Sequence, residues 1–286
     1  MSVATPAAIS DVTLIDVTKV EPVPELHRNF NVRRIEFQYP DGRVIRVGGF
    51  GRSKKGSYSP RHRHTFDQVR MVLEGGAKFG PLRCHGGDCV YFPEGVFYGP
   101  QEHITDYATI LLIQTQGPTW GPFPTYPQMD VAYAAMQDEG VFDRAEGKFR
   151  WKDGRVQDGF EAILEHLIGG EAEYPEPRYH SPCVLRSNNF AFRPMPDGRL
   201  AAVKPLAGFN GSGPLLELWK LEPGAETPRL QPSRNMAIVL MSGGVSYHGQ
   251  AATPGTYLFC PPGSTFDGLQ TNAGAELLSV EFEPRQ

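Results

Sequence analysis

The sequence of 286 residues predicts an all-β fold made of two successive modules. Gly (32) and Pro (26) are frequent, and between them lie short segments rich in β-branched and aromatic residues, which is typical of β-sandwiches and barrels. Six glycines and prolines recur 168 residues later, for example from residue 56 to residue 224, which indicates an internal repeat. The chain is also longer than a usual single domain, so two cores of roughly 110 to 170 residues are expected.

The segments expected to be strands follow the same order in both modules. In the first module they are residues 32–39, 44–50, 69–73, 90–92 and 108–114. In the second they are residues 183–185, 200–203, 215–221, 236–241, 256–260 and 277–282. No alternation of strands with long helices and no glycine-rich nucleotide loop occurs in the sequence, which argues against an α/β fold.

Helical segments are expected only between the modules. Residues 129–137 follow Pro127, and residues 160–168 end at Gly169 and Gly170, a common helix stop. The intervening residues 145–159 are charged and turn-rich, so we expect a surface linker there, with a mobile loop as the alternative. The predicted organisation is a first module over residues 1–127, a connector over 128–175 and a second module over 176–286.

The composition of the chain limits which binding partners and which cellular compartment are expected. A net charge of -4 and a pI near 6.1 provide no basic surface for nucleic acid. The chain shows no apolar run approaching the ~20 residues of a membrane helix and no leader pattern at its start, so a soluble, cytoplasmic protein without a membrane partner is expected. The four cysteines form no CxxC pair and are expected to be reduced, buried thiols.

Residues able to bind metal occur in the first copy of the repeat alone. The first motif runs from Gly56 through His62, His64 and Gln68 to Gly75, and the second runs from Gly87 through Pro93 and Gly95 to Tyr98. In an extended strand residues two apart project to one face, so His62, His64 and Gln68 point together while Asp67 points away. Imidazole nitrogens and an amide oxygen are ligands for divalent transition ions. The spacing therefore predicts a metal site.

Both motifs resemble those of the cupin superfamily, in which the first is Gly-x5-His-x-His-x3–4-Glu-x6-Gly and the second is Gly-x5-Pro-x-Gly-x2-His-x3-Asn. The resemblance covers both copies and implies a bicupin, two tandem jelly-roll β-barrels with short connecting helices. Gln68, Tyr98 and Glu102 stand where the family has Glu, His and Asn. The resemblance implies His62, His64, Gln68 and Tyr98 as metal ligands, and it leaves His103 as an unassigned candidate.

Loss of the carboxylate changes the expected electrostatics of the site. Two histidines and one glutamine leave a divalent ion with its full charge, which would attract an anionic oxygen of a substrate or the phenolate of Tyr98. Tyr98 is therefore a candidate catalytic acid or base. Two alternatives stay open: Gln68 hydrogen-bonds a buried backbone group or a ligating water, and Tyr98 caps the core with its ring.

Three arginines flank the motif residues. Arg63 and Arg70 are expected to face outward, away from the histidines, whereas Arg61 is placed to reach a bound anion. The corresponding positions of the second copy hold Leu230, Pro232, Met236 and Phe266. The second module is therefore expected to carry no metal, and a structural role, a dimer contact or an apolar ligand pocket are its possible functions.

A metal-dependent enzyme acting on a small aromatic or carboxylate-bearing compound is the function expected first. Aromatic residues cluster around the motifs, among them Phe66, Tyr91, Phe92 and Phe97, and aromatic walls favour a small organic substrate. By the resemblance, dioxygenase chemistry leads, with iron as the first ion and Ni, Mn, Cu, Co or Zn as alternatives. The alternatives are a lyase or isomerase that uses Tyr98, and a non-catalytic binding protein. The resemblance also implies a homodimer.

Overall fold

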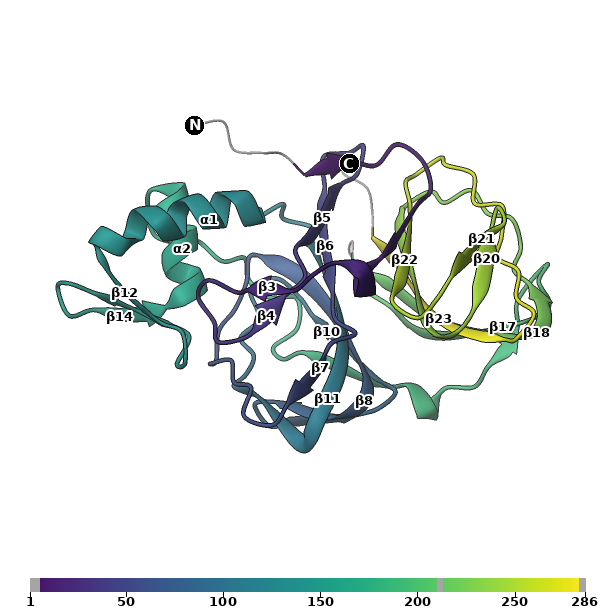
Figure 1. Ribbon diagram of the computed structural model, residues 1–286, viewed down its shortest axis with the longest axis horizontal. Coiled ribbons are helices and arrows are strands. Elements are labelled where there is room, and N and C mark those ends of the chain that lie inside the picture. The colour runs from purple at the N-terminus through teal and green to yellow at the C-terminus, as the bar shows by residue number, and fades with distance from the viewer. Residues whose placement is uncertain (1–5, 210–212, 283–286) are drawn as a thin grey trace. The chain divides into compact units, whose positions relative to one another are not determined.

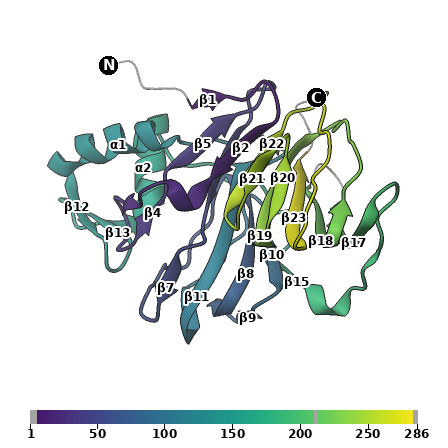
Figure 2. The ribbon, with the colours of Figure 1, turned by 45° about the vertical axis from the view of Figure 1, so that its right-hand side comes forward.

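A computed structural model describes residues 6–209 and 213–282 of the chain. Its contacts divide the chain into two compact units. The first contains Glu21–Glu36 and Val44–Val184, and the second contains Ala8–Val20, Phe37–Arg43 and the described part of residues 185–286. Each unit is a jelly-roll β-barrel, which confirms the predicted fold class. Figure 1 shows the strands of both barrels, and Figure 2 shows them from a second direction.

The first barrel is built on a nine-stranded sheet in the order β1-β5-β6-β11-β8-β10-β15, with β7 beside β11 and β9 beside β8. Its strands are β1 (Ala7–Ala8), β5 (Ile35–Gln38), β6 (Val44–Gly48), β7 (Arg52–Lys54), β8 (Phe66–Phe79), β9 (Leu82–His85), β10 (Asp88–Phe92), β11 (Gln101–Gln116) and β15 (Cys183–Arg186). The long strands β8 and β11 pair antiparallel and form its wall (Figure 1). Of the predicted segments of the first module, residues 69–73, 90–92 and 108–114 lie within these strands, and residues 32–39 and 44–50 extend beyond β5 and β6.

A small lobe follows the first barrel and belongs to the same unit. Its helices are α1 (Tyr126–Ala135) and α2 (Gly159–Ile168). Thr125 and Gln128 form a capping box at the start of α1, and Gly169 ends α2 with a φ of 70°. Both predicted helices are therefore present. The 3₁₀ turn η2 (Met136–Asp138) follows α1.

The expectation of a linker over residues 145–159 is wrong. The segment supplies β13 (Lys148–Trp151) and β14 (Val156–Asp158), which form a three-stranded sheet with β12 (Gly140–Asp143). Phe149 is fully buried and its ring contacts Phe142 at 4.5 Å and Trp151 at 4.7 Å between centroids. The alternation of Phe149 and Trp151 was the signal of a strand, hidden among charged neighbours.

The second barrel has a seven-stranded sheet in the order β16-β17-β18-β23-β19-β22-β2 (Figure 2). Its elements are β2 (Thr13–Asp16), β16 (Arg193–Pro194), β17 (Arg199–Gly208), β18 (Leu215–Glu226), β19 (Asn235–Gly243), β20 (Val245–Tyr247), β21 (Gln250–Ala252), β22 (Thr256–Cys260) and β23 (Ala275–Phe282), with 3₁₀ turns η1 (Val17–Lys19) and η3 (Ser187–Asn189).

The unit boundaries differ from those expected from the sequence. Strand β2, near the start of the chain, pairs antiparallel with β22 and so completes the second barrel's sheet. The lobe over residues 126–168 belongs to the first unit and is not a separate connector. An open sheet edge can form hydrogen bonds with a strand from any distance in the sequence. The residues of a short segment such as β2 do not show which strand it will pair with.

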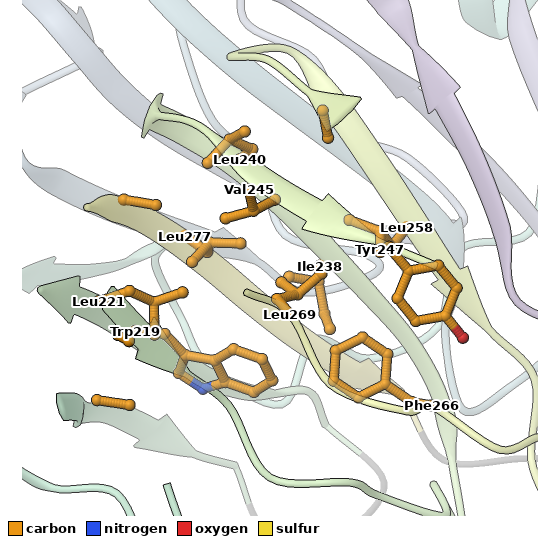
Figure 3. Packing of buried hydrophobic residues seen from close by; sticks show 14 of the residues in the cluster. Trp219, Leu221, Ile238, Leu240, Val245, Tyr247, Leu258, Phe266, Leu269 and Leu277 are labelled. Carbon is orange, nitrogen blue, oxygen red and sulfur yellow. The ribbon is translucent and has the colours of Figure 1, made fainter. Parts of the chain in front are cut away.

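Packed side chains fill the interior of the second barrel. Trp219, Ile238, Tyr247, Phe266 and Leu269 converge in its core (Figure 3). The repeat survives in the backbone, because Leu230 and Phe266 exchange hydrogen bonds of 2.8 and 2.9 Å in the way that His62 and Tyr98 do in the first barrel. Phe266 is fully buried in this core, and Leu230, which is partly buried, packs against it.

All four cysteines are free, as expected; Cys84, Cys89 and Cys260 are buried, and Cys183 is half-buried. Within residues 6–209 and 213–282, the structure contains no helix whose length and hydrophobicity would let it cross a bilayer.

Candidate functional site

Backbone hydrogen bonds hold the two motifs of the first barrel against each other. His62 and Tyr98 each donate an N–H to the other's carbonyl oxygen, at 3.0 Å in both directions. The carbonyl oxygen of His64 accepts the N–H of Gly95 at 2.8 Å. Gly95 has a φ of 77°, and a Cβ there would lie 2.0 Å from the carbonyl oxygen of Pro175, so only glycine fits. This pairing brings Tyr98 opposite the two histidines.

The rings of His62, His64 and Tyr98 form one cluster. The centroids of the His62 and His64 rings are 4.8 Å apart, and Tyr98 lies 4.5 Å from His62 and 6.0 Å from His64. All three side chains are buried. His64 also stacks on Phe66 at 4.4 Å and meets Phe160 of helix α2 edge-on at 4.7 Å. The three side chains named from the spacing of the motifs therefore lie together.

Gln68, the fourth predicted ligand, lies beside Tyr98 and is fully engaged in hydrogen bonds. Its Nε2 donates to the Tyr98 hydroxyl at 2.9 Å. Its Oε1 accepts from Nε2 of Gln114 at 2.9 Å and from Nη2 of Arg70 at 3.0 Å. These bonds satisfy both ends of the amide, and they involve side chains rather than the backbone group or water considered from the sequence.

Arg70 faces the histidines, so the expectation that it points outward is wrong. Its Nη2 donates to Gln68 and, at 3.1 Å, to the Tyr98 hydroxyl, and its Nη1 donates to Gln101. The guanidinium carbon lies 5.1 Å above the Phe92 ring and 5.2 Å above that of Tyr98. The two-residue alternation of side chains along a strand predicts this orientation, because residue 70 is separated from residues 62, 64 and 68 by even numbers of residues.

A cavity of about 300 Å³ opens beside this cluster within the first unit. The polar residues of its wall include His62, His64, Arg70, Gln101, His103 and Gln114. The apolar residues include Phe30, Val47, Phe66, Ile110, Met129 and Phe160. Neither Gln68 nor Tyr98 is part of the lining, and Arg70, which contacts both, is. A site with one polar end and apolar walls suits a small organic ligand.

Bulges in β11 determine which of its side chains reach the cavity. The pairing of β11 with β8 shifts register between His103 and Ala108 and again between Thr109 and Ile110. The cavity is therefore lined by residues 101 and 103 before the bulges and by residues 110, 112 and 114 after them. Nε2 of His103, the candidate left unassigned from the sequence, lies 3.0 Å from the Ser53 hydroxyl.

Charge compensation differs among the four arginines that line the cavity. Arg28 pairs with Asp158 at 2.9 Å, and Arg46 pairs with Glu36 at 2.6 Å. Arg33 contacts the carbonyl oxygen of Gly49 at 3.4 Å. In the described part of the chain, neither Arg33 nor Arg70 has a carboxylate partner.

Burial keeps the histidines neutral and Tyr98 protonated. Desolvation lowers the pKa of His62 to about 4 and that of His64 well below its ordinary value. Burial also raises the pKa of Tyr98, and the opposing effects of Arg70 and of the Gln68 hydrogen bond are smaller. Neutral imidazoles can bind a metal ion or accept a proton, whereas Tyr98 is suited to donate one.

Two of the four predicted ligands fit a divalent ion. Nδ1 of His62 lies 2.6 Å from the Pro60 carbonyl oxygen, which leaves Nε2 as the free nitrogen, and Nδ1 of His64 is buried without a hydrogen-bond partner in the described chain. The Gln68 and Tyr98 oxygens fit poorly, because each already accepts two hydrogen bonds, one from cationic Arg70. Among described residues, no group of three or more His, Cys, Asp and Glu is placed to hold a metal.

Asp67 lies on the other face of β8, as the alternation predicted. Its carboxylate accepts hydrogen bonds from the Tyr91 hydroxyl at 2.9 Å, the Glu94 N–H at 2.8 Å and Arg178 at 3.0 Å. It is buried without reaching the cavity. Asp67 thus fastens the segment around residue 178 to the barrel and does not replace the missing carboxylate ligand.

A second cavity of about 270 Å³ adjoins His62. Arg61 and Arg63 line it and lie 4.2 and 4.6 Å from the centre of the Phe97 ring. Arg61, which was expected from the sequence to reach a bound anion, therefore does not line the larger cavity. Arg70 lines that cavity instead.

No family model and no curated protein matches the chain. Solved structures do match over nearly its whole length. A candidate dioxygenase from Nostoc punctiforme superimposes with a TM-score of 0.63 at 13% identity, covering 96% of this chain and 83% of the other. The oxalate decarboxylase of Bacillus subtilis, studied for its Mn(II) centres, gives a TM-score of 0.58 at 14% identity, covering 96% and 78%. At such identities the likeness shows the shared two-barrel fold.

Proposed function

We propose that the first barrel is the active site of a metal-dependent enzyme that acts on a small organic acid. The observation that carries the proposal is the cavity of about 300 Å³, where two buried, neutral histidines meet a guanidinium without a carboxylate partner. Pockets that combine apolar walls with a few perturbed titratable groups are the usual sites of catalysis. The second barrel, whose interior is packed, is proposed to be structural.

His62 and His64 would hold the ion. Their neutral imidazoles are suitable donors for Fe, Mn, Ni, Cu, Co or Zn, and with two protein ligands most coordination positions stay open to substrate and solvent. A divalent ion there would act as a Lewis acid on a substrate oxygen and, if redox-active, would support chemistry with O₂. The Mn(II) centres of the B. subtilis oxalate decarboxylase, which shares the fold, support this proposal. Iron is proposed first because dioxygenase chemistry leads.

Dioxygenation of an aromatic or carboxylate-bearing substrate is the proposed reaction class. Support comes from the rings of Phe66 and Phe160 in the cavity wall and from the fold shared with the candidate dioxygenase of N. punctiforme. Homodimer formation, a cytoplasmic location and the lack of a nucleic-acid partner stay predictions. A non-catalytic binding protein is the alternative to any enzyme.

Metal removal tests the proposal. Chelator-treated protein is expected to lose turnover of a panel of aromatic and aliphatic carboxylates, and reloading with Fe(II) is expected to restore it with about one ion per chain. Elemental analysis and an oxygen electrode measure both quantities. Product formed without O₂ would exclude a dioxygenase, and full turnover by metal-free protein would exclude the metal requirement.

A lyase or isomerase that uses Tyr98 is the second candidate, favoured by the state of this residue. Gln68 and Arg70 both donate to the Tyr98 oxygen, so its own proton is not used in either bond, and burial keeps it protonated. Tyr98 would then be the proton donor of the reaction, with a neutral histidine as the acceptor.

Replacing Tyr98 by phenylalanine separates the two candidates. For a lyase or isomerase the turnover number of Tyr98→Phe is expected to fall by about 10²- to 10⁴-fold in steady-state assays, because the general acid is lost. Tyr91→Phe is the matched control, since Tyr91 is also buried in the first barrel but contacts Asp67 on the other face of β8. Wild-type turnover by Tyr98→Phe would leave Tyr98 without a catalytic role.

A further inference from the structure

Arg70 carries a positive charge that the described protein does not neutralise. Its hydrogen bonds go to Gln68, Tyr98 and Gln101, which are all neutral. In contrast, Arg28 and Arg46, which line the same cavity, each have a buried carboxylate partner. A partly buried cation without a counter-ion is costly, and such a cation is normally paired when the site is in use.

The surroundings of Arg70 hold its guanidinium in one position. Gln68 and Tyr98 accept from one nitrogen, Gln101 accepts from another, and the plane lies over the rings of Phe92 and Tyr98. Gln114 fixes Gln68 in turn. A guanidinium positioned in this way is suited to bind a carboxylate, because little conformational entropy is lost when the two hydrogen-bond.

We infer that Arg70 binds the carboxylate of the substrate, and that Gln68 and Tyr98 position Arg70 instead of coordinating the metal ion. Arg70 lines the cavity, whereas Gln68 and Tyr98 do not line it and contact Arg70 instead. The inference deepens the proposed function and rests on this cavity being the substrate site. In this arrangement Arg70 binds the substrate, and His62 and His64 bind the metal ion.

The size and walls of the cavity narrow the substrate class. About 300 Å³ corresponds to roughly ten water molecules in the liquid, which is enough space for a monocyclic aromatic acid. Phe66 and Phe160 supply flat apolar walls for a ring, and Arg70 supplies the anchor for its acid group. The substrate class is therefore a monocyclic aromatic or similarly apolar carboxylate.

Calorimetric titration of metal-free protein with benzoate tests the inference without relying on turnover. Chelator-treated wild-type protein is expected to bind benzoate, and to bind uncharged benzamide at least about tenfold more weakly. Arg70→Ala is expected to weaken benzoate binding by at least about 30-fold and to leave benzamide binding unchanged. Arg70→Lys should restore part of the affinity, because it keeps the charge but not the planar fork.

Two further variants test whether the effect on benzoate binding is specific to Arg70 and independent of folding. Arg63→Ala is the matched control on the same segment, since Arg63 lines the smaller cavity and stacks on Phe97 and Tyr174. Its benzoate affinity should equal that of wild type. Thermal unfolding of Arg70→Met is expected to occur no lower than that of wild type, because the change removes an uncompensated charge. If an Arg70 variant is folded but does not bind benzoate, the loss is due to the missing interaction between Arg70 and the carboxylate.

Metal affinity shows whether Gln68 and Tyr98 position Arg70 or coordinate the metal ion. Titration with Mn(II) is expected to give Gln68→Ala and Tyr98→Phe affinities within about threefold of wild type, while His62→Ala weakens binding by at least about 100-fold. Equal losses in Gln68→Ala and His62→Ala would overturn the inference, as would unchanged benzoate affinity in Arg70→Ala or a loss confined to Arg33→Ala. Benzoate binding without any metal binding would instead contradict the metal-dependent function and leave Arg70 in its role.

Discussion

Replacing His62 and His64 together by alanine is expected to abolish metal binding and to reduce turnover to background. The two rings lie 4.8 Å apart, both are buried at the cavity, and burial favours their neutral, metal-binding form. Each single replacement should lower metal affinity by at least about 100-fold, since even partners in the outer shell of a metal site contribute 10- to 100-fold. With only two strong donors, neither histidine has a substitute.

Elemental analysis after dialysis against Fe(II) or Mn(II), followed by assays on the active substrate, measures this effect. His85→Ala is the control, because His85 is an exposed histidine of the same barrel, at the end of β9. A double variant that retains one ion per chain would show that metal is bound elsewhere. A double variant that loses the ion but keeps its turnover would make the reaction independent of metal.

Phe266→Ala is expected to lower the free energy of unfolding by about 3–5 kcal/mol, the usual cost of truncating a buried aromatic side chain. Phe266 is fully buried, stacks on Tyr247 at 5.7 Å between ring centroids and belongs to the second barrel's core (Figure 3). It occupies the position that Tyr98 holds in the first barrel. Loss of its ring would open a cavity that the surrounding strands cannot close.

Urea unfolding followed by circular dichroism measures this loss. Phe192→Ala is the matched control in the same unit, because Phe192 is 36% exposed and its truncation should cost less than about 1 kcal/mol. A loss below about 1 kcal/mol for Phe266→Ala would contradict the packed interior and would favour the apolar ligand pocket considered from the sequence.

Spacing and alternation in the sequence were sufficient to find the fold and the centre of the site. The repeat of Gly and Pro at an offset of 168 residues corresponds to two barrels with matching backbone pairs, His62 with Tyr98 and Leu230 with Phe266. The His-x-His spacing put both histidines on one face, where a two-residue period applies. Such patterns are local, and each residue contributes to them through its immediate neighbours.

Three features of the site were missed for identifiable reasons. Arg70 has the parity of the histidines, but it was grouped with Arg63 as alternating with them and was therefore expected to face outward. Gln114 reaches the cavity from the parity opposite to that of His103 because β11 bulges between them, and no residue pattern in the sequence indicated the bulge. Phe160, which packs on His64, arrives from a helix about 100 residues along the chain.

Residue order alone specified two β-barrels, a pair of histidines on one face in the first, proposed to bind metal, and apolar residues at the matching positions of the second, because periodicity and fixed spacing can be read directly from the sequence. Folding in three dimensions assigned the remaining roles. It placed Arg70 on Gln68 and Tyr98, so that a guanidinium meets the two oxygens expected to bind a metal. Whether an oxygen accepts from an arginine or coordinates an ion depends on which side chains surround it, and Tyr98 and Gln114 reach Gln68 from 30 and 46 residues along the chain.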